Sequence, residues 1–169
     1  MTSNSAHETF LVCLERHRGI LLKIANAYCR DAADREDLAQ EIALQLWRAY
    51  PRFDGRVQFS TWMYRIAVNV AISFYRSGRR KTGRMEGASG ERLEQLAAAD
   101  RESDENAALL REIIGSFDAL NRALMILYLD DRSYSEIAEI LGITQTNVAT
   151  KINRLKGQLR RGVAAQAVP

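Results

Sequence analysis

The sequence predicts an all-α protein made of two small helical domains joined by a flexible linker. Helix-breaking residues are scarce, with 2 Pro and 10 Gly in 169 residues, and the helix-favouring residues Ala, Leu, Ile, Arg and Glu are common. Hydrophobic residues make up 47% of the chain and charged residues 27%, which is typical of a folded globular protein. At residues 81–106 glycine, serine and mixed charges replace most large aliphatic residues, so we expect a linker there and domains at residues 1–80 and 107–169.

The first domain is predicted to contain three helices, at about residues 8–28, 35–49 and 60–77. Apolar residues recur along each of them at the spacing of a helix that buries one face. Pro51 and Gly55 end the second helix in a loop. The inward-facing residues of the second and third helices are then Leu38, Ile42, Leu46, Met63, Ile66, Ala67, Val70 and Phe74.

The second domain is predicted to contain four short helices, at about residues 107–116, 121–129, 134–141 and 145–161. Asn121 is a favourable N-cap for the second of these helices. The last two helices lie too close together in the sequence for a long loop, so they must meet at a tight turn.

These last two helices form the most informative motif in the sequence, a helix-turn-helix. Gly142 permits the positive φ needed to leave the first helix in a tight turn, and Thr144 is placed to cap the second. An ordinary helical hairpin with a solvated face is the alternative. The outward positions of the second helix carry mainly amides, hydroxyls and cations, which are the groups that bind base edges and phosphates: Gln145, Thr146, Asn147, Ala149, Thr150, Lys151, Asn153, Arg154 and Lys156.

Charges are distributed unevenly, although the net charge is only +3. No acidic residue occurs between Asp54 and Glu86, and none occurs from Thr144 to Gly162, while both stretches hold several Lys and Arg residues. Two separated basic stretches indicate two contacts with a polyanion. An acidic cluster at residues 31–41 indicates a different, basic partner, although solvated helix faces also explain such runs.

The first basic stretch also contains aromatic residues, a combination that suits unstacked bases and backbone phosphates. Trp62 lies on the third helix and Phe53 in the loop before it. Core aromatics with arginines on the surface are the alternative, and Trp62 in particular fits a core position. The polar candidates for nucleic-acid contact in this stretch are Arg56, Arg65, Asn69 and Arg76.

The sequence also excludes several classes of protein. The N-terminus lacks the basic and apolar segments of a secretion signal, and the charge-free stretch at residues 66–75 is too short to span a membrane. The 2 cysteines, Cys13 and Cys29, form no CxxC motif, which argues against a zinc site or a disulfide framework. We therefore expect a reduced, cytoplasmic protein without a metal or a cofactor.

Two segments of the chain resemble a known family. Region 2 of bacterial RNA polymerase sigma factors resembles DREDLAQEIALQLWRAYPRFDGRVQFSTWMYRIAVNVAISFYR, and their region 4 resembles LNRALMILYLDDRSYSEIAEILGITQTNVATKINRLKGQLRR. The resemblance covers about residues 8–77 and 107–163, and a chain with only these two regions resembles the extracytoplasmic-function (ECF) class. It implies an all-α fold and a promoter-specificity subunit, which binds core polymerase, recognises promoter DNA and helps to open it without catalysis.

The resemblance also implies which residues meet the polymerase. In the family a D-L-x-Q-E stretch docks on the clamp coiled coil of the β′ subunit, and region 4 sits on the β flap. An anti-sigma factor or another inhibitor is the further partner that the family implies. The residues of this chain that match the D-L-x-Q-E stretch are Asp37, Leu38, Gln40 and Glu41.

The resemblance assigns the minus-ten element to the first domain and the minus-thirty-five element to the second. The loop that contains Phe53 resembles one that holds a flipped minus-ten base, and Asn69 matches a family residue at the same site, so we expect both in one pocket. The helix-turn-helix reads the major groove. By position, the best base readers are Thr150, Asn153 and Arg154, with Lys151 as a phosphate contact and Asn147 and Lys156 on the same face.

Two other functions are weighed against this one. A stand-alone helix-turn-helix regulator would bind duplex DNA unaided, but it needs a dimer surface and the sequence offers no spare amphipathic helix. A metal-dependent nuclease would use the acidic cluster as ligands, but no histidine accompanies it. The acidic residues in question are Asp31, Asp34, Glu36, Asp37 and Glu41.

Overall fold

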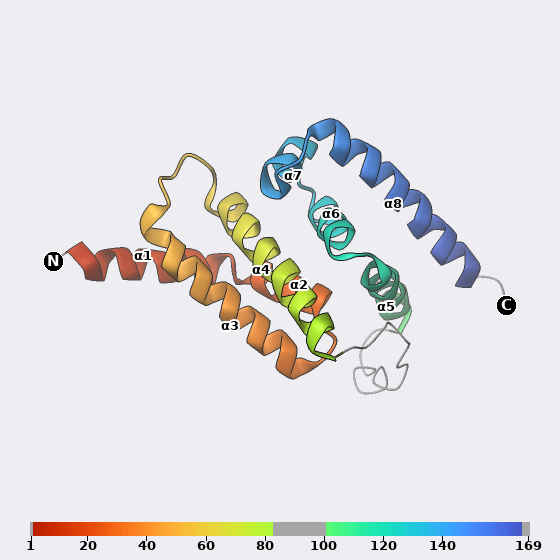
Figure 1. Ribbon diagram of the computed structural model, residues 1–169, viewed down its shortest axis with the longest axis horizontal. Helices are drawn as coiled ribbons and strands as arrows, with labels where there is room; N and C mark the ends of the chain where they lie inside the picture. Colours follow the sequence, from red (N-terminus) through yellow and green to blue (C-terminus); the bar gives the residue numbers. More distant parts are fainter. Residues whose placement is uncertain (1, 83–100, 167–169) are drawn as a thin grey trace.

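The computed structural model describes residues 2–82 and 101–166, and every regular element in that part of the chain is a helix. The first bundle contains α1 (Thr2–Arg16), α2 (Arg18–Tyr28), α3 (Ala32–Ala49), the 3₁₀ turn η1 (Tyr50–Arg52) and α4 (Phe59–Thr82). The second bundle contains α5 (Arg101–Ser116), α6 (Ala119–Leu129), α7 (Tyr134–Leu141) and α8 (Gln145–Gln166). The prediction of an all-α fold with two domains is therefore confirmed, and Figure 1 shows the two bundles side by side.

The first bundle is built around α2, α3 and α4. Its core includes Ile24 of α2, Ile42 of α3 and Met63 of α4, all of which are fully buried. Residues 8–28, expected to form one helix, form two helices, because the backbone leaves helical geometry at His17. The His17 ring lies 2.9 Å from the Cys13 carbonyl, and Gly19, which weakens a helix, follows two residues later.

The second bundle contains the four expected helices with different boundaries. Helix α6 begins at Ala119, and its N-cap is Asp118, whose carboxylate accepts a 2.8 Å hydrogen bond from the Asn121 amide. The expected N-cap at Asn121 is therefore wrong, because the Asp118 carboxylate, directly before the helix, accepts from a free N–H group of its first turn. Helix α5 begins at Arg101, so the end of the expected linker is helical. The helical turn expected near residues 91–98 lies outside the described residues.

The two bundles pack directly against each other. Helices α2 and α4 of the first bundle contact α5, α6 and α7 of the second, as Figure 1 shows. The Tyr28 hydroxyl donates a 2.6 Å hydrogen bond to the Ala119 carbonyl across the boundary. Because buried residues of both bundles form one continuous apolar cluster, the two domains share a core in this arrangement.

Candidate nucleic-acid interface

Helices α7 and α8 form the helix-turn-helix that the sequence predicts. Ser133 and Glu136 make a reciprocal capping box at the start of α7: the Ser133 hydroxyl accepts from the Glu136 amide, and the Glu136 carboxylate accepts from the Ser133 amide. The hydrogen bond from the Ser133 backbone amide, together with a weaker one to its side chain, lowers the pKa of Glu136. Gly142 ends α7 with φ of 67°, a left-handed conformation that glycine adopts without strain. Helix α7 is thus capped at its start and ended by a defined turn.

Helix α8 is oriented by one buried stripe. Val148, Ile152 and Leu155 are almost completely buried. At its N-terminus the Thr144 hydroxyl accepts a 3.1 Å hydrogen bond from the Asn147 amide, which confirms the predicted cap. Burial of one stripe leaves the opposite face of α8 open to solvent.

The predicted base-reading residues lie on that open face. Asn147, Thr150, Asn153 and Arg154 are exposed, whereas Lys151 and Lys156 are half-buried. The Thr150 hydroxyl donates to the Thr146 carbonyl at 2.9 Å, so its oxygen keeps acceptor capacity but its proton is in use. Lys156 places its Nζ atom 5.3 Å from the centre of the Tyr128 ring, which holds its side chain beside α6. The free amides and the guanidinium of this face match the chemistry of base edges.

The predicted polymerase-binding residues on α3 divide into two groups. Leu38 is fully buried, so its side chain is part of the core in this structure and orients the helix. Asp37 and Gln40 are exposed and Glu41 is half-buried, with the Gln45 amide donating to the Glu41 carboxylate at 2.7 Å. The polar members of the set therefore form one accessible acidic stripe.

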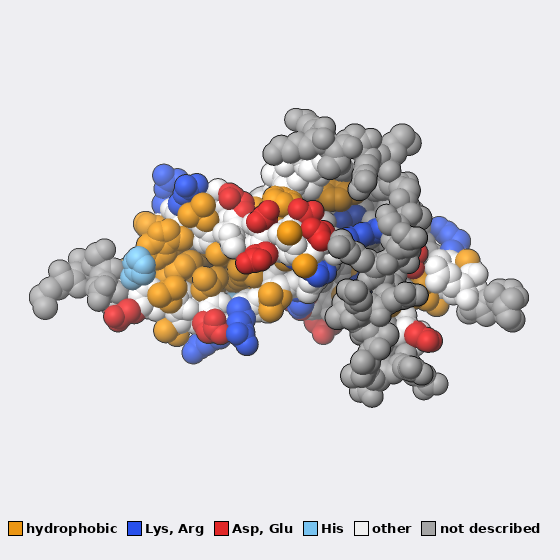
Figure 2. Space-filling view, turned by 90° about the horizontal axis from the view of Figure 1, so that it is seen from below, with side chains coloured by type: hydrophobic (Ala, Val, Ile, Leu, Met, Phe, Trp, Pro, Cys, Tyr) orange, Lys and Arg blue, Asp and Glu red, His pale blue; other side chains and the backbone are white. Residues whose placement is uncertain are grey.

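Exposed apolar residues continue this stripe toward the end of α3. Leu44 is 41% exposed and Trp47 is 36% exposed, one and two turns beyond the acidic residues. Figure 2 shows apolar side chains gathered over the N-terminal end of the molecule, with acidic side chains next to them. Sequence reasoning missed Leu44 and Trp47, although both fall at the three- to four-residue spacing of the acidic stripe.

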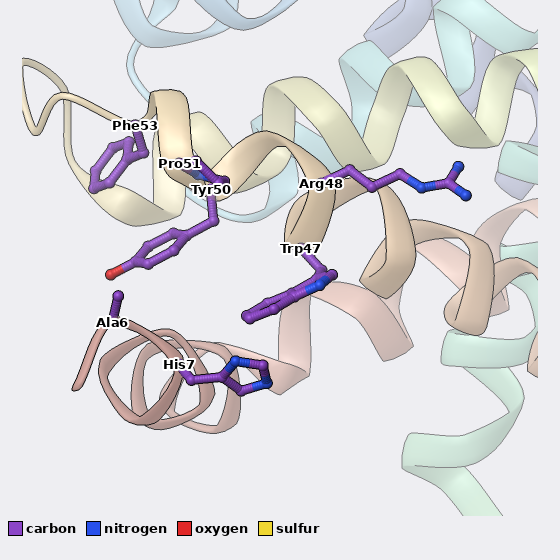
Figure 3. A pocket seen from close by; sticks show the side chains of 7 residues that line it. All are labelled: Ala6, His7, Trp47, Arg48, Tyr50, Pro51 and Phe53. Atoms are coloured by element: carbon purple, nitrogen blue, oxygen red, sulfur yellow. The ribbon is translucent and has the colours of Figure 1, made fainter. Parts of the chain in front are cut away.

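The loop residue Phe53 belongs to an aromatic cluster at the end of α3 and the start of α4. Its ring centre lies 4.9 Å from that of Trp62, 5.7 Å from that of Phe59 and 6.3 Å from that of Tyr50. Phe53 and Trp62 are both half-buried. The cluster borders a hollow of about 500 Å³ that α1 closes on one side. Figure 3 shows the Trp47 ring beside His7 and the Tyr50 ring pointing toward Ala6. Its lining residues are Ala6, His7, Trp47, Arg48, Tyr50, Pro51 and Phe53.

Asn69 lies at a separate place. It is exposed on α4 and lines a groove of about 660 Å³ between α3 and α4, together with Glu41 and Ser73. The structure therefore does not place Phe53 and Asn69 in one pocket. The reason is helical geometry: Asn69 is two turns beyond Trp62, about 10 Å along the helix axis, while Phe53 packs beside Trp62.

The three predicted arginine contacts of the first bundle also differ in surroundings. Arg56 pairs with Asp54 at 3.1 Å in the exposed loop. Arg76 is exposed on α4. Arg65 pairs with Glu139 of α7 at 3.2 Å, a contact that no sequence pattern indicates because the partners are far apart in the chain.

The described residues hold no group of three or more His, Cys, Asp or Glu side chains that could bind a metal ion. Both cysteines are free, and burial raises the pKa of the Cys29 thiol to about 11. Within the described ranges no helix is both long and apolar enough for a membrane span.

Comparison with known proteins identifies both halves of the chain. Sigma-70 region 2 matches residues 13–81, and Sigma-70 region 4 matches residues 107–159. The chain is 30% identical over 139 residues to the ECF RNA polymerase sigma factor SigW of Bacillus subtilis (strain 168), covering 76% of this chain and 74% of that one. It is 29% identical over 160 residues to the ECF RNA polymerase sigma-E factor of Escherichia coli (strain K12), covering 88% of this chain and 83% of that one.

Solved structures share the fold over nearly the whole chain. CnrH, solved in complex with the cytosolic domain of CnrY, superposes with a TM-score of 0.70 at 21% identity and covers 95% of this chain and 91% of its own. The sigma factor RpoE from Bartonella quintana, solved with the anti-sigma factor NepR, gives a TM-score of 0.69 at 18% identity and covers 94% of this chain and 96% of its own.

The two matched regions, their order and the helix-turn-helix geometry agree, and they disfavour a stand-alone regulator. The chain belongs to the extracytoplasmic-function sigma factors, and it is a promoter-specificity subunit of bacterial RNA polymerase.

Proposed function

We propose that this sigma factor divides its work among three surfaces. The acidic stripe of α3 binds core polymerase, the exposed face of α8 reads the minus-thirty-five element, and α4 with the preceding loop holds melted minus-ten DNA. In this division the first domain is residues 1–80, the linker 81–106 and the second domain 107–169. The protein contributes recognition and strand separation and has no catalytic step of its own.

The observation that carries the proposal is the composition of the open face of α8. Amides and a guanidinium are exposed there, the opposite stripe is buried, and the chain holds no acidic residue from Thr144 to Gly162. A face of this kind gains from phosphate contacts along its length and can discriminate bases through Asn153 and Arg154.

The α3 surface supports the proposed polymerase contact. Asp37 and Gln40 are exposed, and Leu44 and Trp47 add apolar area beside them. An acidic rim next to an apolar centre suits a basic, amphipathic helical partner, and the clamp coiled coil of the β′ subunit is the proposed one. The proposed contact of the second domain is the β flap.

The first bundle supports melting through two separate elements. The Phe53 and Trp62 rings are half-buried, so each has an edge or face left on which a base can stack, a contact worth about 1–3 kcal/mol. Asn69, on the groove beside α3, can hydrogen-bond to a second base or to the backbone. Capture of unpaired bases offsets the few kcal/mol needed to unstack them and holds the duplex open.

We further propose that a protein inhibitor, an anti-sigma factor, controls this chain. RpoE, one of its structural neighbours, is bound to such a factor. The exposed apolar residues of α3 offer a surface that an inhibitor can cover, and an inhibitor there would compete with polymerase for the same stripe.

Transcription by a reconstituted holoenzyme tests the proposal. Core polymerase with the wild-type chain should initiate at a limited set of genomic start sites that share a minus-thirty-five sequence. The Arg154→Ala chain should lose preference among those sites, while Arg161→Ala, which changes a charge farther along α8, should keep it. Equal initiation on all DNA by both variants contradicts the proposed reading face.

A further inference from the structure

The side chain of Lys156 on α8 lies against an aromatic ring of α6. Its Nζ atom is 5.3 Å from the centre of the Tyr128 ring, within the distance at which the face of a ring attracts a cation. Both side chains are half-buried, so part of each remains open to solvent. The contact therefore joins a proposed DNA-contacting cation to a residue outside the helix that reads DNA.

The core of the second bundle fixes the position of Tyr128. The residue lies in the last turn of α6, where its neighbours Leu124 and Leu127 are completely buried. Its own ring packs against the same core as a partly buried residue, and its carbonyl accepts a 3.1 Å hydrogen bond from the Asp131 amide. Because close-packed side chains have little freedom to move, α6 presents the ring to Lys156 as a fixed surface.

Helix α8 itself offers Lys156 no partner of opposite charge. No acidic residue occurs from Thr144 to Gly162, so the positions one turn away cannot supply an ion pair within the helix. One turn later stands Arg160, whose like charge repels the amine. In the part of the chain that the structure describes, no ion pair includes Lys156. The Tyr128 ring is therefore the contact that orders this amine.

An aromatic ring orders a cation without neutralising it. Arg65, for comparison, pairs with the Glu139 carboxylate at 3.2 Å, so a phosphate must compete with a carboxylate for that guanidinium. Lys156 has an uncharged partner and keeps its whole charge for a polyanion. A lysine side chain loses rotamer freedom when it binds, and the ring has already restricted this one, so less freedom is lost when Lys156 meets a phosphate.

We propose that Tyr128 is a positioning residue for promoter binding, whose ring holds the Lys156 amine at the edge of the α8 face for contact with a DNA phosphate. This inference rests on the proposed reading of DNA by α8 and adds to it a residue of α6. The proposed base readers Asn153 and Arg154 lie less than one turn before Lys156. Since phosphate contacts fix the register of a protein on the duplex, an ordered amine at this position sets how those two side chains meet the base edges.

A double-mutant cycle in the reconstituted holoenzyme tests this role. Binding to a promoter fragment from which the wild-type holoenzyme initiates is measured at several salt concentrations. Lys156→Met should weaken binding and lower the salt dependence by about one phosphate contact. Tyr128→Leu, which removes the ring and keeps an apolar side chain, should weaken binding by about two- to fivefold, the factor expected for an exposed cation–π contact. In the Lys156→Met chain, Tyr128→Leu should have no further effect.

Two controls separate positioning from packing. The conservative variant Tyr128→Phe keeps the ring and should restore wild-type binding. In a chain with Arg161→Met, which removes an exposed charge farther along α8, Tyr128→Leu should keep its full effect. Tyr128→Met serves as the ring-free variant if circular dichroism shows Tyr128→Leu to be unfolded. An equal loss from the ring-free variant with and without Lys156 would make Tyr128 a merely structural residue and overturn the inference, as would wild-type binding by that variant.

The contact itself can be measured in the free full-length chain by nuclear magnetic resonance. The ring current of Tyr128 should shift the Lys156 ε-methylene resonances upfield in the wild type and in Tyr128→Phe, and the ring-free variant should lose this shift. Unshifted resonances in the wild type would overturn the inference. This measurement needs no DNA, so its failure differs from a failure of α8 to read promoters, which would appear as unchanged promoter preference in Arg154→Ala.

Discussion

Arg65 and Glu139 form a 3.2 Å ion pair that joins α4 to α7 across 74 positions of sequence. The arginine is a proposed minus-ten contact, and the glutamate belongs to the first helix of the helix-turn-helix. While the pair forms, the carboxylate compensates the charge of the guanidinium and occupies one of its nitrogens, so Arg65 attracts a DNA phosphate less strongly. The pair therefore links the DNA-binding capacity of one bundle to the position of the other.

Glu139→Gln should free Arg65 for nucleic acid. Both side chains are more than 40% exposed, so loss of the pair should change the free energy of unfolding by less than about 1 kcal/mol. Binding of a single-stranded minus-ten oligonucleotide by the free chain should increase, as measured by fluorescence anisotropy. Adding Arg65→Gln to the same chain should cancel the increase in binding. If the increase remains, residues other than Arg65 cause it.

Asp37→Lys should weaken core-polymerase binding in a competition assay by about tenfold or more, because the charge reversal faces a basic partner. The residue is exposed, so the melting temperature should hardly change. Glu112→Lys, at an exposed site on α5, is the control of equal charge change. If both substitutions weaken binding alike, the effect comes from net charge and the α3 contact is wrong.

Leu38→Ala should behave differently from its neighbours in the same motif. Leu38 is fully buried, so the truncation should lower the free energy of unfolding by about 2–5 kcal/mol. Chemical denaturation measures this loss. A stable Leu38→Ala chain with weak polymerase binding would instead make Leu38 a contact residue and contradict its place in the core.

Arg154→Ala and Lys151→Ala should separate base reading from phosphate binding. Loss of Arg154 should cost about 1–3 kcal/mol at one position of the minus-thirty-five site. Loss of Lys151 should weaken binding to every sequence and lower the salt dependence by about one phosphate contact. Holoenzyme binding to single-base variants of a promoter at several salt concentrations distinguishes them. If both variants lose the same affinity on every sequence, Arg154 and Lys151 do not have separate roles.

Phe53→Ala and Asn69→Ala should impair promoter opening while leaving polymerase binding intact. Because the two residues line different hollows, their effects on the free energy of opening should add in the double variant. Permanganate footprinting of melted thymines gives the open fraction, and a template with a pre-melted bubble should restore transcription. A double variant no worse than either single one would indicate a shared pocket.

The packing of the two bundles against each other should weaken in acid. Burial raises the pKa of Asp130, but hydrogen bonds from Lys23 and Tyr64 outweigh burial and hold this pKa below its usual value. A carboxyl group whose pKa is depressed by the packing of the two bundles stabilises that packing at pH values above its ordinary pKa of about 3.9. The contribution is lost as the pH falls through the depressed pKa. The radius of gyration, measured by small-angle X-ray scattering, should therefore rise only after the pH has fallen below the ordinary carboxyl pKa of about 3.9. Asp130→Asn, which cannot titrate there, should lack this rise; an identical rise in both chains assigns it to other groups.

Much of each bundle could be predicted because its signals are local. The positive φ at Gly142, the cap at Thr144 and the buried residues Val148, Ile152 and Leu155 all follow from spacing within one helical turn or two. The acidic stripe on α3 follows from the same periodicity. The local pattern predicted the wrong N-cap for α6, because Asp118 and Asn121 are both favourable capping residues near the start of this helix.

The contacts between the bundles could not be predicted. Asp130 meets Lys23 and Tyr64 across 107 and 66 positions of sequence, and no periodicity relates residues so far apart. Arg122 looks like a surface cation in an amphipathic helix, yet it is buried against backbone carbonyls and aromatic rings. Such positions are decided by tertiary packing, so the sequence predicted two domains but not their docking.

The covalent connection between the bundles limits how far apart they can move and how long they stay apart. Helix α4 ends at Thr82 and α5 begins at Arg101, so these two residues can be at most about 70 Å apart. Two surfaces tethered over such a distance meet at an effective concentration in the millimolar range. A brief loss of the Asp130 contacts therefore does not keep the bundles apart, because they meet again quickly. Core polymerase must hold each bundle at its own site for as long as the promoter is being opened.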